Sequence, residues 1–200
     1  MTVANSRTAD HPIDPMFLER WSPRAFTGEA MSEADLLTML EAARWAASSY
    51  NSQPWRFLYA RRGTAHWDKF LDLLVPFNRS WAKDASALVV LVSNSLMRPP
   101  GAERDVPSHS HSLDAGTASG YFALQASRMG WFVHGMVGVD MDRAFADLNV
   151  PQGFRVEAAY AVGKRGDASS LPEALQAREQ PSPRVPLAHL AFEGGFPTES

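Results

Sequence analysis

Hydrophobic and polar positions follow two periods along the chain, and together they predict alternating helices and strands. Apolar residues recur at helical spacing behind Ser32, which predicts a helix from about 33 to 47 with Ser32 as its N-cap. Residues 87–94 (ALVVLVSN) form a run of β-branched and apolar residues that is too short for a membrane helix, so we expect a buried strand. Helical spacing returns over 113–129, where Gly130 is expected to end the helix.

Weaker patterns fill the intervals between these segments. Residues 56–62 predict a short strand, and residues 67–77 predict a helix that stops at Pro76. Two later stretches, WFVHGMVGVD (131–140) and FRVEAAYAVGKRG (154–166), predict further strands. This order of elements is typical of a mixed α/β or α+β domain in which helices flank one sheet.

Three segments lack any periodicity. Residues 1–15 are polar and contain two prolines, so we expect a flexible lead. Residues 95–112 contain three prolines and predict a loop, which we interpret as a flap over a site. Residues 171–200 are rich in Pro, Gly and Ala and predict an extended tail that lies over a neighbouring molecule. No linker divides the chain, so we predict a single domain over 1–200.

Composition narrows the class of protein. The 200 residues carry a net charge of −3, which gives no electrostatic reason to expect nucleic acid as a partner. There is no cysteine, which excludes disulfides, thiolate nucleophiles and cysteine-ligated metals. No apolar stretch approaches the ~20 residues of a membrane span, and the first residues lack the apolar run of a signal peptide. We therefore predict a cytoplasmic protein.

The stretch ERWSPRAF is the first candidate binding motif. Arg20, Ser22 and Arg24 alternate, so in an extended segment their side chains point the same way. Two guanidinium groups with a hydroxyl between them suit a phosphate. The alternative is a surface loop whose arginines pair with acids such as Glu19 and Glu29.

The second candidate, WAASSYNSQPWRF (45–57), places short polar side chains between two tryptophans. Ser48 and Ser49 can donate hydrogen bonds to a ring carbonyl. Asn51 and Gln53 offer both donors and acceptors, as a uracil-like edge requires. The alternative is helix capping and turn formation, which use the same residue types.

Glycines and histidines supply weaker candidates. Gly116, Ala118 and Gly120 give the 113–129 helix a small-residue face for close packing against another helix, as at a dimer seam. Gly135 and Gly138 would let backbone approach a ligand, although ordinary core packing is the favoured interpretation of all five positions unless a ligand is shown. A separate hypothesis is a metal site at SHSHS, whose His109 and His111 lie on one side of an extended strand without a third ligand nearby.

Taken in order, these segments resemble the FMN-dependent nitroreductase family. The resemblance rests on R-x-S-x-R-x-F at 20–26, AARWAASSYNSQPWRF, an asparagine in PFNRSW, DAGTASGYFALQASRMG, GMVGVD and a late PSPR. It covers about 17–190. It implies the nitroreductase-like α+β fold, with a mostly antiparallel sheet flanked by helices and a C-terminal extension that wraps a partner subunit.

The resemblance also implies a homodimer with two FMN sites, each built from both subunits. It places Arg20 on the phosphate side, Arg24 near the pyrimidine end of the flavin, Asn78 at the pyrimidine edge, and backbone around Val137 and Gly138 near the flavin N5. The further residues that it assigns to FMN are Trp21, Ser22 and Arg184 from the same chain, and Ser48, Ser49 and Asn51 from the partner.

The implied activity is hydride transfer from NADH or NADPH to FMN, followed by reduction of a nitroaromatic, a quinone or a similar acceptor in the same pocket. Such sharing gives ping-pong kinetics, and no catalytic side chain is required because the cofactor performs the chemistry. Two alternatives stay open. One is a non-catalytic flavin-binding or storage protein, and the other is a metal- or small-molecule-binding domain without flavin.

This sequence departs from the family pattern at a few positions. Position 182 is serine where many members have a basic residue, so either phosphate binding is weaker or Lys164 or Arg165 compensates. Trp21 and Tyr50 are bulkier than the residues that many members have there. These two rings and the 95–112 loop would narrow the pocket, which is the basis of the storage hypothesis.

Overall fold

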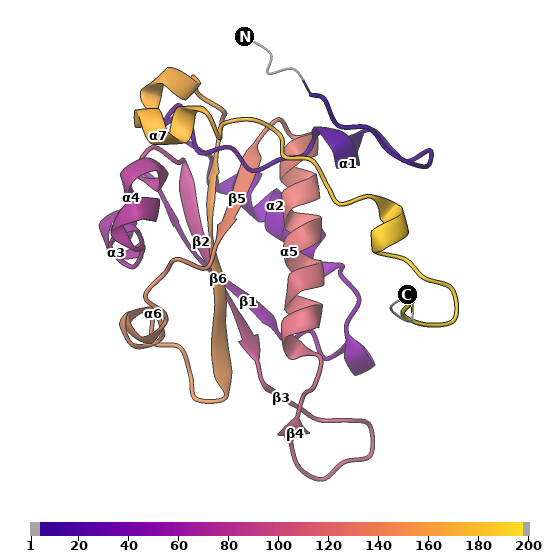
Figure 1. Ribbon diagram of the computed structural model, residues 1–200. Coiled ribbons are helices and arrows are strands. Elements are labelled where there is room, and N and C mark those ends of the chain that lie inside the picture. Colours follow the sequence, from indigo (N-terminus) through magenta and orange to yellow (C-terminus); the bar gives the residue numbers. More distant parts are fainter. Residues whose placement is uncertain (1–4, 198–200) are drawn as a thin grey trace.

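The computed structural model describes residues 5–197 and is built around one four-stranded antiparallel sheet (Figure 1). The strands lie in the order β1 (Trp55–Arg61), β2 (Ala87–Asn94), β6 (Phe154–Gly163) and β5 (Phe132–Met136), and every neighbouring pair is antiparallel. The predicted mixed α+β fold with an antiparallel sheet flanked by helices is confirmed.

Strand β2 lies in the middle of the sheet and is buried on both faces, as its apolar run predicts. Leu88, Val90 and Val92 belong to one hydrophobic cluster, whereas Val89 and Leu91 belong to the other. Successive side chains of a strand point to opposite faces, so a strand covered on both sides must be apolar at every position. The sheet therefore separates two cores.

One face is covered by α2 (Glu33–Arg44) and α5 (His111–Arg128), which also pack against each other (Figure 1). The N-cap of α2 is as expected, since the Ser32 hydroxyl accepts a hydrogen bond from the Asp35 N–H at 3.0 Å. The helix ends at Arg44, three residues earlier than predicted. Trp45 and Ala46 donate to carbonyls three residues back, which tightens the last turn and stops the helix.

The opposite face is covered by α3 (Trp67–Asp72), α4 (Pro76–Ala82) and α6 (Met141–Asp147) (Figure 1). The predicted helix over 67–77 is two helices, because Pro76 starts α4 instead of ending the preceding helix. A proline is tolerated in the first turn, where its missing N–H has no intrahelical partner to lose. Helix α6 was not expected, although its N-cap is visible in the sequence as Asp140, which accepts from the Arg143 N–H at 3.0 Å.

The segment 95–112 is more ordered than a plain loop. It contains a short hairpin of β3 (Leu96–Met97) and β4 (Val106–Pro107), and α5 begins within it at His111. His111 is thus a helix residue bonded to Ser93, with Nδ1 and Oγ 2.7 Å apart, and the expected extended SHSHS strand is wrong. Among the described residues no group of three or more His, Cys, Asp or Glu side chains is arranged to hold a metal ion.

The chain ends outside the sheet. Short helices α1 (Met16–Glu19) and α7 (Glu173–Gln176) and the 3₁₀ turns Ala168–Ser170 and Leu187–His189 interrupt otherwise extended segments. From α7 the tail crosses one end of the sheet, passes the N-terminal segment and runs out beside α5 (Figure 1). Within residues 5–197, no helix combines the length and the apolarity that crossing a membrane requires.

Candidate functional site

A small basic cavity lies where the N-terminal segment, the 20–24 motif, β5 and the tail meet. We call it the basic well; it encloses about 200 Å³. Its lining residues are Arg7, Arg20, Trp21, Ser22, Arg24, His134, Arg178, Gln180, Ser182 and Arg184. The two arginines and the serine of the 20–24 motif were predicted to point the same way. All three line this cavity. Arg20 Nη1 also donates to Ser22 Oγ at 3.3 Å.

A buried carboxylate from the tail fixes the backbone of this motif. Both oxygens of Glu179 accept from the Arg24 N–H, at 2.8 and 3.0 Å, and Oε1 also accepts from the Ala25 N–H at 2.9 Å. The Glu179 residue is only 6% exposed. These bonds connect positions about 155 residues apart in the sequence. They hold the 20–24 motif, near the N-terminus, against the C-terminal tail.

The well holds positive charges close together. Burial, followed by the nearby Arg7 and Arg184, lowers the pKa of Arg20 below its ordinary value. Burial and Arg178 lower the pKa of Arg24, although Glu179 partly opposes this. The Arg24 Nε is buried and has no hydrogen-bond partner among the described residues. Converging guanidinium groups with an unsatisfied donor are typical of a site that binds an anion.

His134 on β5 closes the floor of the well in its neutral form. Burial lowers its pKa to about 4, and nearby Arg24 and Arg20 act in the same direction. Its Nδ1 lies 3.0 Å from the Pro23 carbonyl oxygen, and its ring packs on Trp81 with centroids 4.6 Å apart. An imidazole neutral at pH 7 adds no further charge to the five arginines that line the cavity.

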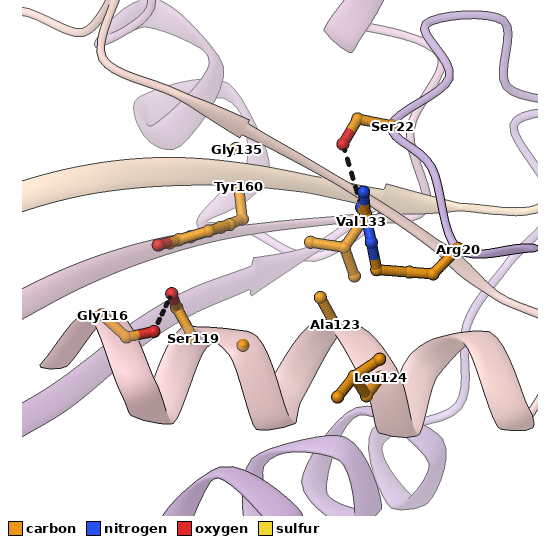
Figure 2. Close-up of a pocket in the computed structure, with 10 residues that line it drawn as sticks. Arg20, Ser22, Gly116, Ser119, Ala123, Leu124, Val133, Gly135 and Tyr160 are labelled. Atoms are coloured by element: carbon orange, nitrogen blue, oxygen red, sulfur yellow. Dashed lines mark hydrogen bonds between the residues drawn. The ribbon is translucent and has the colours of Figure 1, made fainter. Parts of the chain in front are cut away.

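A second, more apolar cavity of about 370 Å³ adjoins the well, and we call it the trough (Figure 2). It runs between α5 and the β5–β6 edge of the sheet, and Arg20 and Ser22 line both cavities. Small residues open it, namely Gly116, Gly120 and Gly135. A Cβ at Gly135 would approach the Tyr160 ring to 3.1 Å, so the absence of a side chain there preserves the space.

The sequence-predicted pair Asn78 and Gly138 lies beyond the end of β5. The Asn78 amide donates from Nδ2 to the Gly138 carbonyl at 3.0 Å, and a Cβ at Gly138 would overlap that amide. Val137, between β5 and Gly138, is 79% exposed. His134, Gly135, Val137 and Gly138 follow one another along the chain, so β5 connects the well and the trough to this pair.

The third predicted group, Ser48, Ser49 and Asn51, occupies a separate loop. Tyr50, Asn51 and Gln53 all have left-handed backbone conformations, with φ of 51°, 54° and 46°. Left-handed backbone is costly for residues with a Cβ and is concentrated at functional sites. The loop is tied to α5 by Asp114, whose Oδ2 accepts from the Ser49 N–H at 3.2 Å and from Ser110 Oγ at 3.0 Å.

The structure thus places the predicted residues in three groups within one chain, and the group expected to act from the partner subunit, Ser48, Ser49 and Asn51, lies apart from the 20–24 motif. Trp21 and Arg184 line the basic well with the 20–24 motif, whereas the Asn78 pair and the Ser48–Asn51 loop lie outside both cavities. Lys164 is not in the well. It donates to the Gly130 carbonyl at 2.9 Å and lies over the Trp131 ring, just beyond the end of α5.

Two arginines of the well, Arg7 and Arg178, were missed by sequence reasoning. Arg7 lies in the segment expected to be a flexible lead, and Arg178 lies in the tail. No local pattern marked either residue, because the tail carries its two arginines, 178 and 184, among four glutamates. The small face of α5 also differs from expectation, because Ala118 is buried in the core while Gly116 and Gly120 are exposed along the trough.

Comparison with known proteins agrees with this geometry. The profile of the Nitroreductase family matches residues 18–80, which include the 20–24 motif, the Ser48–Asn51 loop and Asn78. A crystal structure of an oxidoreductase containing FMN is 47% identical, with a TM-score of 0.94 and complete coverage of both chains. The chain belongs to the nitroreductase family.

Two further relatives of this nitroreductase-family chain are known from sequence. An uncharacterized 15.4 kDa protein of Mycolicibacterium smegmatis is 31% identical over 147 residues, which make up 70% of this chain and 95% of that protein. The major NAD(P)H-flavin oxidoreductase of Aliivibrio fischeri is 34% identical over 90 residues, 43% of this chain and 40% of that enzyme. The match therefore covers nearly the whole of the first relative but less than half of the second.

Proposed function

We propose that the protein is an FMN-dependent NAD(P)H oxidoreductase that reduces a nitroaromatic compound, a quinone or a similar small acceptor. The observation that carries this proposal is the basic well, where an unpartnered Arg24 Nε and four further arginines line a cavity of about 200 Å³, which has room for a phosphate group. Family membership and the FMN in the 47% identical oxidoreductase support it. The NAD(P)H-flavin oxidoreductase relative supports the electron donor.

The residues present fit FMN. The well offers charge-assisted donors for a phosphate, and the adjoining trough is lined by glycines that leave room for a group attached to that phosphate. Both cavities share Arg20 and Ser22, so a ligand whose phosphate lies in the well can extend into the trough. The proposed phosphate ligands are Arg20, Ser22 and Arg184, and Trp21 would form part of the wall.

When bound, FMN would supply hydride and electron transfer between NAD(P)H and the acceptor. The protein's own residues would orient and polarise it. Asn78, held by its bond to the Gly138 carbonyl, would face the pyrimidine edge, and the backbone of Val137 and Gly138 would approach the flavin N5. Arg24 would place a positive charge where electron transfer builds negative charge, which raises the reduction potential.

We further propose that the enzyme is a homodimer whose Ser48, Ser49 and Asn51 complete the partner's site. In one chain this loop lies outside both cavities. Support comes from α5, where Leu113 is 73% exposed. Exposed apolar residues in the tail, which include Val185, Leu190 and Phe196, suit a segment that covers a neighbouring subunit. A cytoplasmic location stays a prediction from the sequence.

The decisive experiment is the visible absorption spectrum of the purified protein, followed under anaerobic conditions during addition of NADH and then of NADPH. A flavin spectrum that one nucleotide bleaches would establish the reductive half-reaction. Steady-state rates with a quinone should then give the parallel double-reciprocal lines of ping-pong kinetics. Flavin that neither nucleotide bleaches would favour the storage alternative. Failure to take up FMN would contradict the proposal.

Complementation in mixed dimers tests the shared site. Arg20→Ala should weaken FMN binding by about 1.5–3 kcal/mol, the value of a hydrogen bond to a charged group. Ser49→Trp should block binding through the partner. A mixture of the two variants should regain one intact site per heterodimer, measured as bound FMN per chain. If no binding returns, the loop does not act across the interface.

A further inference from the structure

Arg7 lies in the wall of the basic well, far in sequence from the motif that the well contains. Its Nε donates to the Ser182 carbonyl at 2.8 Å, and its Nη1 donates to the carbonyls of Arg20 at 2.8 Å and Leu18 at 3.1 Å. These bonds join the N-terminal segment, the 18–20 backbone and the tail. Among residues 5–197, its Nη2 has no hydrogen-bond partner. Arg7 is thus fixed in place with one donor group unused.

The charges around Arg7 are nearly all of its own sign. Burial and then Arg184 lower the pKa of Arg7, and Arg7 in turn contributes to the lowered pKa of Arg20. The one carboxylate that contacts the motif, Glu179, is bonded to the N–H groups of Arg24 and Ala25. Backbone carbonyls hold the guanidinium groups of Arg7 and Arg184, and the Ser22 hydroxyl holds that of Arg20. An anion bound between these three positive groups would offset their mutual repulsion.

We propose that Arg7 binds the phosphate group of FMN together with Arg20 and Arg184. The inference rests on the proposed function. On the tail side of the well, residue 182 is a serine that faces Arg7 with its backbone carbonyl, so its side chain brings no charge there. Arg7 supplies the positive charge at this position, and its three backbone bonds orient it without the entropic cost of ordering a free side chain.

The test compares two ligands that differ only in the phosphate. Dissociation constants for FMN and riboflavin are measured by flavin fluorescence with the full-length protein after flavin removal. The variants are Arg7→Ala, Arg7→Lys and, as a matched loss of charge outside both cavities, Arg143→Ala. We expect Arg7→Ala to weaken FMN binding about 10- to 100-fold and to change riboflavin binding less than about twofold. Arg7→Lys keeps the positive charge but loses the guanidinium fork, so it should bind FMN less tightly than the unmodified protein and more tightly than Arg7→Ala.

Three outcomes would overturn the proposal. They are equal weakening of FMN and riboflavin by Arg7→Ala, no weakening of either, and an Arg7→Lys protein as impaired as Arg7→Ala. The last would mean that Arg7 only clamps the backbone. Weakening by Arg143→Ala as large as that by Arg7→Ala would likewise count against a local role.

A second measurement separates this inference from the proposed function. Inorganic phosphate should raise the unfolding temperature of the flavin-free protein, and Arg7→Ala should remove most of that rise. If the unmodified protein binds neither flavin but keeps the Arg7-dependent phosphate effect, the proposed function fails and the anion site stands. If the phosphate effect does not depend on Arg7, the inference itself fails.

Discussion

The basic well and the Ser48–Asn51 loop supply the two halves of the proposed flavin site, and within one chain they differ in where their polar groups point. In the well, donors converge inward, and Arg7 and Glu179 bind three distant segments together. In the loop, Tyr50, Asn51 and Gln53 face solvent in left-handed conformations, and Asp114 is the side chain that ties the loop to α5. The proposed phosphate site is assembled within one chain, whereas the loop presents its groups outward, as a contribution to a neighbouring site would.

The largest expected effect comes from removing the carboxylate that holds the well. Glu179→Ala leaves the N–H groups of Arg24 and Ala25 without their acceptor and removes the negative charge next to the arginines. We expect a loss of about 3–5 kcal/mol in the free energy of unfolding, measured by urea denaturation. Glu179→Gln keeps an acceptor oxygen and should lose less.

The matched control for Glu179 is Glu173→Ala, an exposed carboxylate on α7 in the same tail. Its unfolding free energy should stay within about 0.5 kcal/mol of the unmodified protein, as for most surface substitutions. Equal losses in the two variants would mean that Glu179 does not hold the well together.

His134 gives the well a pH dependence. Because burial lowers its folded pKa to about 4, from an ordinary value of 6.5, the unfolded chain binds a proton more readily than the folded protein does. The free energy of unfolding should therefore fall by about 3 kcal/mol as the pH drops from 6.5 to 4. Above pH 6.5 this contribution is constant.

The check on His134 is the difference between the unmodified protein and His134→Asn, measured by urea denaturation at several pH values. Asparagine loses the ring packing on Trp81 but does not titrate, so the gap between the two proteins should narrow as the pH falls to 4. A gap that is independent of pH would show that His134 titrates normally when folded.

The same contrast explains what the sequence could predict. Strand β2 and the Ser32 cap follow from neighbouring residues, so local pattern was sufficient for both. The well depends on Arg7 and Glu179, whose partners lie about 155 to 175 residues away, and no local period carries that information. Local alternation grouped Arg20, Ser22 and Arg24, and the resemblance added Arg184; all four line the well.

The loop shows a different limit of sequence analysis. SSYNSQ was expected to form either a binding surface or a turn, and its observed backbone is a turn with left-handed residues that carry a Cβ. Propensity disfavours that conformation, so only the surrounding structure can impose it. The conformation of the loop therefore depends on the side chains that bind it to the rest of the protein.

Asp114 is expected to be that support. Asp114→Ala removes the acceptor for the Ser49 N–H and for Ser110 Oγ, and should lower the unfolding free energy by about 2 kcal/mol. It should also weaken FMN and riboflavin equally, in contrast with Arg7→Ala, because the loop is proposed to contact the ring and not the phosphate. Ser110→Ala keeps the Ser49 bond and serves as the control; it should leave both flavin affinities unchanged. If Asp114→Ala weakened FMN binding more than riboflavin binding, the loop would act on the phosphate as the well does, and the proposed difference between the two regions would be wrong.

The smallest effect concerns the strain in the loop. Tyr50 has φ of 51° and is 68% exposed, so its ring contributes little packing to balance the cost of a left-handed backbone. Asparagine adopts this conformation more readily, and Tyr50→Asn should raise the unfolding free energy by about 0.5–1 kcal/mol, measured by urea denaturation. Asn149, which already has φ of 52°, provides the reverse control, since Asn149→Tyr should destabilise by a similar amount. If Tyr50→Asn destabilises the protein instead, the exposed ring packs against a partner that the isolated chain lacks, and the loop would be part of an interface already formed in solution.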